Sequence, residues 1–113
     1  MTPEEKKARL AQIAKSIDKI HERLEQIPSE KVRLDDARRE VRKKGLQKLG
    51  QAQEQIKEGK NHAMIKESAE QSEKIGAELA EIGRHSKQLE EEEIKLQAEL
   101  AVLETERKKL ISS

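Results

Sequence analysis

Two pairs of side chains in this sequence have the spacing of metal ligands on one helix face. Glu58 and His62 are four residues apart, and so are Glu81 and His85. Residues four apart on a helix point to the same side, so each pair could offer a carboxylate and an imidazole to a cation. A zinc site needs three or four protein ligands, and no further ligand is expected to approach either pair. We therefore expect solvated side chains here, with no bound metal and no other cofactor.

The sequence offers no arrangement suited to catalysis. It contains no cysteine, which excludes thiolate nucleophiles, and it has no glycine-rich loop for phosphates. A Ser-His-Asp triad could not be held in place on a narrow helical rod, and such a rod has no concave pocket for a small-molecule substrate. We expect a protein that is not an enzyme.

Basic residues gather between positions 31 and 48. This stretch holds eight lysines and arginines against three acidic residues, a surplus of five positive charges. The surplus suits a phosphate backbone, although such runs are also common on solvated helix faces. The chain has no aromatic residue, so a nucleic acid would be bound through phosphates and shape rather than by base stacking. The residues expected to make these contacts are Arg38, Arg39, Arg42, Lys43, Lys44 and Lys48.

The composition is typical of long helices rather than of a globular core. Charged residues make up 42% of the chain, and Phe, Tyr and Trp, which dominate most cores, are absent. A seam between two helices needs only aliphatic side chains. The net charge of +1 gives the whole chain no bulk attraction to nucleic acid or membrane. No apolar run reaches the ~20 residues of a membrane span, and the charged start is unlike a signal peptide, so we expect a cytoplasmic protein.

The first half of the sequence predicts a long helix with one apolar stripe. Thr2 and Pro3 fit the cap and the first position of a helix. Apolar residues then recur from Leu10 to Ile27 at alternating spacings of three and four residues. This is the heptad pattern of a coiled coil, whose apolar stripe must be buried against another helix.

Three features interrupt this pattern. Pro28 removes one backbone hydrogen bond and predicts a kink or a break. Around Gly45 the apolar spacing runs four, four and four, which predicts a stutter that relaxes the supercoil. Gly59, followed by the capping residue Asn61, is the strongest turn signal in the chain.

The second half predicts one returning helix, because heptad spacing continues from Ile65 to Leu110. An antiparallel register in which the numbers of facing residues sum to about 120 pairs each seam position of the first arm with one of the second, for example Gly45 with Ile75. The centre of this register falls in the turn that Gly59 predicts independently. The agreement favours a helical hairpin over the alternative, a three-helix bundle with a loop at Pro28.

We therefore predict an all-α fold, a single antiparallel coiled-coil hairpin of residues 1–113. It comprises an arm at 3–58 that is kinked or broken at Pro28, a turn at 59–61 and an arm at 62–111. The predicted seam consists of Leu10, Ile13, Ile17, Ile20, Leu24, Ile27, Leu34, Val41, Leu49, Ile56, Ile65, Ile75, Leu79, Ile82, Leu89, Leu96, Leu100, Leu103 and Leu110.

Residues 30 to 110 resemble the N-terminal arm of seryl-tRNA synthetases. The resemblance rests on the run from Leu34 to Glu40, on the turn at 57–61 and on the Leu- and Glu-rich returning helix. That family carries a long antiparallel helical hairpin that grips the extra arm of its tRNA. The resemblance thus implies contacts to the RNA backbone from Arg38, Arg39, Arg42, Lys43 and Lys44. Residues 46–50 depart from the family, which usually has an Arg-Asn pair and a Ser-Lys pair before an Ile-Gly.

Two interpretations of function follow from the sequence. The first is a structural or protein-interaction module, a spacer or self-associating coiled coil that meets a protein partner or a second copy. Gly76 and Gly83, one heptad apart beside the seam, would let a second hairpin approach closely, unless they are simply surface glycines that the helix tolerates. The second interpretation is a nucleic-acid-binding arm that uses the basic run. Neither a membrane nor a small-molecule substrate is expected as a partner.

Overall fold

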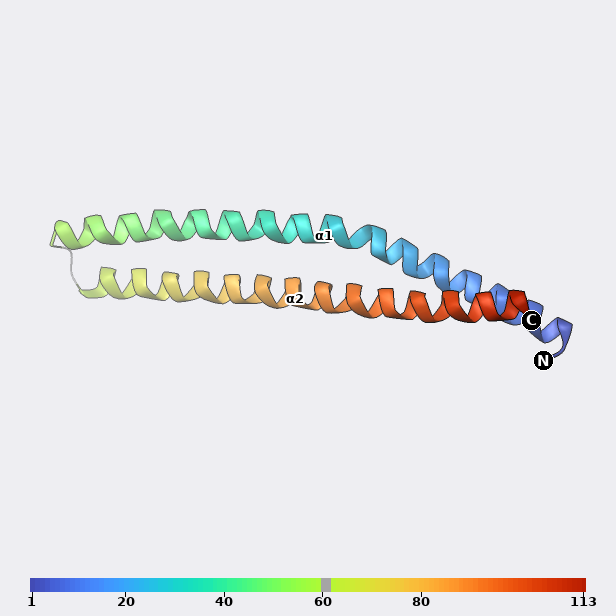
Figure 1. Ribbon diagram of the computed structural model, residues 1–113. Helices are drawn as coiled ribbons and strands as arrows, with labels where there is room; N and C mark the ends of the chain where they lie inside the picture. The colour runs from blue at the N-terminus through green and yellow to red at the C-terminus, as the bar shows by residue number, and fades with distance from the viewer. Residues whose placement is uncertain (60–61) are drawn as a thin grey trace. The chain divides into compact units, whose positions relative to one another are not determined.

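The computed structural model describes residues 1–59 and 62–113, apart from the side chains of His62 and Met64, and it contains two long helices (Figure 1). Helix α1 comprises Pro3–Lys57, 55 residues, and helix α2 comprises His62–Ser112, 51 residues. The described residues form no strand. The predicted all-α class is therefore confirmed.

The chain divides into two compact units, each of which pairs a part of α1 with a part of α2. Unit 1 consists of Met1–Glu30 and Gln88–Ser113, and unit 2 consists of Lys31–Lys87. In unit 1 the Lys6 amine donates to the carbonyl of Ser113 at 2.8 Å, and Arg23 reaches Glu92. Partner numbers fall on α2 as they rise on α1, so the two helices run antiparallel.

The same antiparallel order holds within unit 2. Arg38 donates to the hydroxyl of Ser86 at 3.2 Å, and the hydroxyl of Ser68 donates to the amide oxygen of Gln55 at 3.2 Å. Between these contacts, a methyl group added at Gly45 would lie 3.4 Å from Cγ2 of Ile75. Gly45 therefore faces Ile75 of α2, as the predicted register requires.

Helix α1 begins at the predicted Pro3 and ends at Lys57, one residue before the predicted position 58. The hydroxyl of Thr2 accepts a hydrogen bond from the backbone N–H of Glu5 at 3.2 Å, as an N-cap should, and Pro3 is the first helical residue. At the other end Gly59 has a φ of 70°, the left-handed conformation that glycine adopts without strain. Lys60 and Asn61 of the predicted turn lie outside the described residues.

Pro28 lies inside α1, and the helix has no loop at this point. The three-helix bundle is therefore not supported. Two contacts in unit 1 hold the chain helical on both sides of the proline. Ile27 is completely buried, and an ion pair of 2.6 Å joins Arg23 and Glu30 across two turns of α1. These contacts offset the hydrogen bond that proline removes.

Burial is concentrated in unit 1. Its buried apolar residues are Ile13, Ile17, Ile20, Ile27 and Leu89, whereas in unit 2 only Val41 reaches the same degree of burial among the described side chains. Most other predicted seam residues are half-buried, namely Leu10, Leu24, Leu34, Ile75, Leu79, Ile82, Leu96, Leu100, Leu103 and Leu110.

Three residues predicted for the seam are exposed instead, and all three lie in unit 2. Leu49 is 54% exposed, Ile56 60% and Ile65 39%. The half-buried positions of α1 here are Gly45, Lys48, Ala52 and Gln55. Their spacing of three, four and three keeps the heptad phase of Val41, so α1 does not make the predicted stutter. Because adjacent helical residues are rotated by about 100°, keeping this phase turns Leu49 and Ile56 out of the seam.

Candidate interaction surface

In unit 1 the outer edge of the seam is closed by ion pairs between the helices. Arg9 donates two hydrogen bonds, each of 2.7 Å, to the two carboxylate oxygens of Glu106. This parallel arrangement is the strongest geometry for an arginine and a carboxylate. The hydrogen bonds from Arg9 lower the pKa of Glu106 below its ordinary value. Both side chains remain more than a third exposed, so solvent screens the pair.

A second arginine links the two helices at the same edge. Arg23 donates to Glu92 on α2 and to Glu30 on α1. The hydrogen bond from Arg23 lowers the pKa of Glu92, and the two carboxylates together raise the pKa of Arg23. These groups are committed to each other and hold α1 and α2 in register. They are therefore structural rather than free to bind a ligand.

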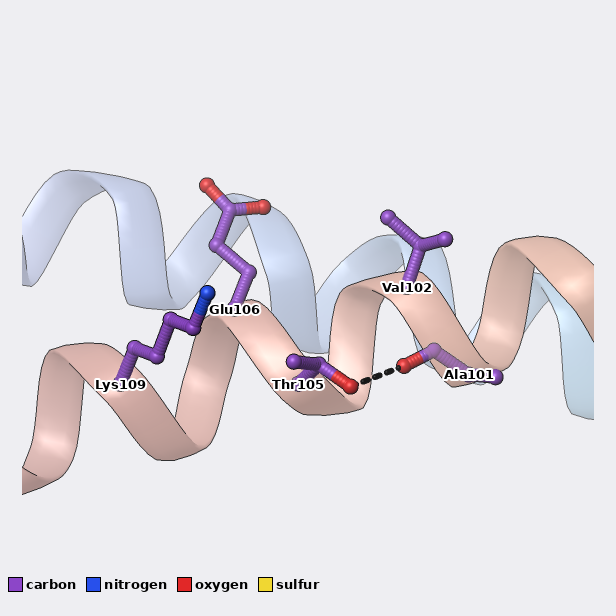
Figure 2. Close-up of a pocket in the computed structure, with 5 residues that line it drawn as sticks. All are labelled: Ala101, Val102, Thr105, Glu106 and Lys109. Carbon is purple, nitrogen blue, oxygen red and sulfur yellow. Dashed lines mark hydrogen bonds between the residues drawn. The ribbon is translucent and has the colours of Figure 1, made fainter.

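Two open depressions also lie on unit 1. Figure 2 shows the first, which is lined by Ala101, Val102, Thr105, Glu106 and Lys109. Two of its polar groups are already used, because the hydroxyl of Thr105 donates to the carbonyl of Ala101 at 2.8 Å and Glu106 is paired with Arg9. The second is lined by Ser16, Lys19, Ile20, Lys95, Ala98, Glu99, Val102 and Leu103. Neither lining includes a histidine or a cysteine.

The residues considered for a metal do not converge. Nε2 of His85 lies 3.7 Å from a carboxylate oxygen of Glu81, as expected for neighbours four apart on one helix. No group of three or more His, Cys, Asp or Glu side chains is arranged to hold a metal ion within residues 1–59 and 62–113. The side chain of His62, considered with Glu58, lies outside the described residues.

The basic run contains both occupied and exposed cations. Arg38 is occupied by Asp35 and Ser86, each at 3.2 Å, and Lys48 is half-buried in the seam. The other four residues proposed for nucleic-acid contacts are exposed and form no ion pair within the described part of the chain, namely Arg39, Arg42, Lys43 and Lys44. Arg42 and Lys43 lie three and four residues after Arg39 and share one side of α1 with it, whereas Lys44 is turned by about 100° from Lys43.

Three exposed apolar side chains of α1 in unit 2, Leu46, Leu49 and Ile56, have a regular position. Each follows a seam position of α1 by one residue, so they lie on a second line along the helix. This line consists of Arg42, Leu46, Leu49, Gln53 and Ile56, all exposed. The fraction exposed is 71% for Leu46, 54% for Leu49 and 60% for Ile56. The spacing of four, three, four and three residues is itself a heptad pattern and could have been found in the sequence.

The corresponding line on α2 carries only small side chains. The half-buried seam positions of α2 here are Ser68, Gln71, Ile75, Leu79 and Ile82. The exposed residues that follow them by one position are Ala69, Ser72, Gly76, Ala80 and Gly83. Antiparallel helices are related by a twofold axis perpendicular to the plane that contains them, so corresponding flanks lie on one face. We call the two lines together the apolar face of unit 2. It has a ridge of Leu and Ile on α1 beside a low shelf on α2.

The opposite face of unit 2 is entirely polar. The exposed residues that precede the same seam positions are Glu40, Lys44, Gln47, Gln51 and Glu54 on α1, and Glu67, Glu70, Lys74, Glu78 and Glu81 on α2. We call this the charged face; it has six glutamates and two lysines. Unit 2 is therefore amphipathic across its width, with apolar side chains on one of two solvent-facing sides.

No protein-family model, curated protein or solved structure matches this chain. Neither helix, over the residues described, has an apolar stretch long enough to cross a membrane. The physical properties of the two faces therefore carry the functional argument.

Proposed function

We propose that this chain is a non-enzymatic, coiled-coil helical hairpin that acts as a protein-interaction module. Its seam would supply stability, and the apolar face of unit 2 would bind a partner. One observation carries the proposal: Leu46, Leu49 and Ile56 are each more than half exposed while Lys48 and Gln55 occupy the seam beside them.

Two possible phases of α1 in unit 2 differ in the apolar surface that they bury. Full burial of a Leu or Ile side chain stabilises a protein by about 1.5–3 kcal/mol. A rotation of α1 by one residue would bury Leu49 and Ile56 and expose Lys48 and Gln55, which a purely structural spacer would favour. The phase that is adopted leaves that apolar surface available for another molecule.

The experiment is capture with a matched pair of variants. The double variant Leu49→Gln/Ile56→Gln removes the centre of the apolar face, and Gln47→Ala/Gln51→Ala changes the charged face. We expect one protein to be retained by the wild type and by the charged-face variant, to be lost with the apolar-face variant, and to bind again when both proteins are purified. If the three chains retain the same proteins, the proposal is wrong.

A second candidate function is nucleic-acid binding. It is supported by the four exposed and unpaired cations Arg39, Arg42, Lys43 and Lys44, and by the resemblance to the tRNA-binding arm of seryl-tRNA synthetases. Phosphate binding predicts an affinity that falls steeply with salt. The logarithm of the association constant should fall with the logarithm of the salt concentration, with a slope of about 0.7–0.9 per neutralised phosphate.

The test of this candidate uses a fluorophore-labelled structured RNA, with duplex DNA beside it, at low and moderate salt. Charge reversal of Arg38, Arg39, Arg42 and Lys43 should abolish binding. Charge reversal of four lysines of unit 1, namely Lys7, Lys15, Lys19 and Lys95, should weaken it far less. Equal losses in the two variants, or no binding at low salt, would exclude this function.

A further inference from the structure

We propose that the apolar face of unit 2 docks one acidic, amphipathic helix of a partner protein. The inference rests on the proposed interaction function and adds the chemical identity of the partner. Three observations carry it: the shape of the face, the sign of the charges at its edge, and the contrast with the charged face.

The shape of the face suits a third helix. The ridge of Leu46, Leu49 and Ile56 offers apolar anchors with heptad spacing, which an amphipathic helix meets with its own residues at positions i, i+3 or i+4, and i+7. Beside the ridge, a methyl group added at Gly76 or Gly83 would meet nothing within 4 Å. A helix axis can therefore approach α2 closely, since interaxial distance is set by the side chains between the helices.

The length of the face sets the length of the partner. From Arg42 to Ile56 the line on α1 covers 15 residues of helix, a rise of about 21 Å at 1.5 Å per residue. A partner helix of about four turns covers it. This is the size of many segments that recognise hydrophobic grooves, and such segments become ordered as they bind.

The charge at the edge of the face selects an acidic partner. Arg42 is the first residue of the line on α1 that contains the ridge, and Arg39 lies three residues before it. Both are exposed and have no ion-pair partner in the described part of the chain. Neither line of the apolar face contains a carboxylate between Arg42 and Ile56 or between Ala69 and Gly83. A partner carboxylate near Arg42 would thus meet a free guanidinium, while a partner lysine would meet a like charge.

The charged face strengthens this selection. Its six glutamates and two lysines repel an acidic helix, so the partner is directed to one side of unit 2 by both attraction and repulsion. A basic helix would be drawn to the wrong side.

A second copy of the chain fits the face less well. If two hairpins packed in parallel, each ridge would lie over the other's shelf, but the two sets of Arg39 and Arg42 would share one end and repel each other. If they packed antiparallel, the cations would separate, but ridge would meet ridge and shelf would meet shelf, leaving a gap. An acidic helix satisfies both the shape and the charge of the face.

The experiment is selection of helical peptides of about 16 residues from a display library, with the full chain as the target. We expect enrichment of peptides that combine a heptad apolar stripe with an excess of Glu and Asp toward one end. Binding of a selected peptide, measured by fluorescence anisotropy, should weaken at least about tenfold in Leu49→Gln and in Arg42→Glu. The controls Gln51→Ala and Lys44→Glu, on the charged face, should leave its affinity within about twofold.

The shelf provides a test that separates binding from folding. Gly76→Ala and Gly83→Ala should raise helix stability, because alanine is the better helix former, yet they should weaken the peptide several-fold by filling the shelf. Circular dichroism of each variant in the absence of peptide confirms that the fold is retained.

The outcomes distinguish this inference from the function on which it rests. Neutral or basic peptides that still require Leu49 would overturn the acidic partner and leave the interaction module. Self-association that is lost in Leu49→Gln, seen by analytical ultracentrifugation, would identify a second copy as the occupant and overturn the inference. If no peptide is enriched and the chain stays monomeric, the inference and the proposed function both fail.

Discussion

Truncation of one buried and one exposed aliphatic residue tests the helical phase of unit 2 against the packing of unit 1. We predict that Ile13→Ala strongly destabilises the chain and that Leu49→Ala barely does. Ile13 is completely buried in unit 1, whereas Leu49 is 54% exposed in unit 2. From sequence alone both residues would be expected in the seam.

The magnitudes follow from burial. Truncating a fully buried Ile to Ala costs about 2–5 kcal/mol, and a two-helix seam that can partly collapse should lie near about 2–3 kcal/mol. Leu49 buries less than half of its side chain, so its truncation should cost less than about 1 kcal/mol, and the higher helix propensity of alanine offsets part of this. With about 4 °C of Tm per kcal/mol for a chain of this size, the expected shifts are about 8–12 °C and under about 4 °C.

The assay is urea and thermal unfolding followed by circular dichroism at 222 nm, since the chain has no Trp or Tyr for fluorescence. Gln51→Ala, an exposed change of similar size on the charged face, serves as the control and should not lower stability. If Leu49→Ala destabilises as much as Ile13→Ala, Leu49 is in the seam. The apolar face, and the proposals that depend on it, would then be wrong.

Three further predictions concern charges and glycines. The pKa values of Glu92 and Glu106 are lowered in the folded chain by hydrogen bonds from arginine; their contribution to stability is therefore present above the unfolded carboxylate pKa of about 4.3 and is lost as pH falls through the folded values. Urea midpoints should fall as pH is lowered through this range, and less in Glu106→Gln; an identical pH profile in that variant would exclude the pair as a cause. Gly59→Ala should cost about 1 kcal/mol in a urea melt, because φ of 70° is strained for alanine; an unchanged midpoint would contradict this backbone conformation. Gly76→Ala should gain about 0.5–1 kcal/mol in the same assay, since the added methyl group has open space inside a helix; a loss of stability would mean that this flank of α2 is covered.

The ends of α1 could be predicted from sequence because each depends on local chemistry. Thr2 can cap only the helix that follows it, and Gly59 can stop only the helix that precedes it. Pro28 was ambiguous from sequence alone, since its effect depends on what lies beside it. The packing of Ile27 and the ion pair from Arg23 to Glu30 keep the helix continuous there.

The phase of α1 in unit 2 could not be predicted from the apolar pattern alone. Two lines of residues, one position apart, both keep heptad spacing, and the line with Leu49 and Ile56 is the more apolar. The apolar pattern of the sequence therefore predicts that Leu49 and Ile56 are buried in the seam. The line with Lys48 and Gln55 occupies the seam instead, where both side chains are half-buried, because it continues in phase with Val41 and ends in the hydrogen bond between Gln55 and Ser68. This helical phase leaves Leu46, Leu49 and Ile56 of the apolar face exposed.

The uneven distribution of buried side chains has a consequence for local opening of the chain. Five of the six most buried residues belong to unit 1, and unit 2 has Val41. Backbone amides exchange with solvent through openings whose free energy rises with the apolar burial around them. Amide protons of unit 2 should thus exchange faster than those of unit 1. A partner helix bound to Leu46, Leu49 and Ile56 would slow amide exchange in unit 2. Part of the binding free energy would then be used to suppress the local opening of unit 2.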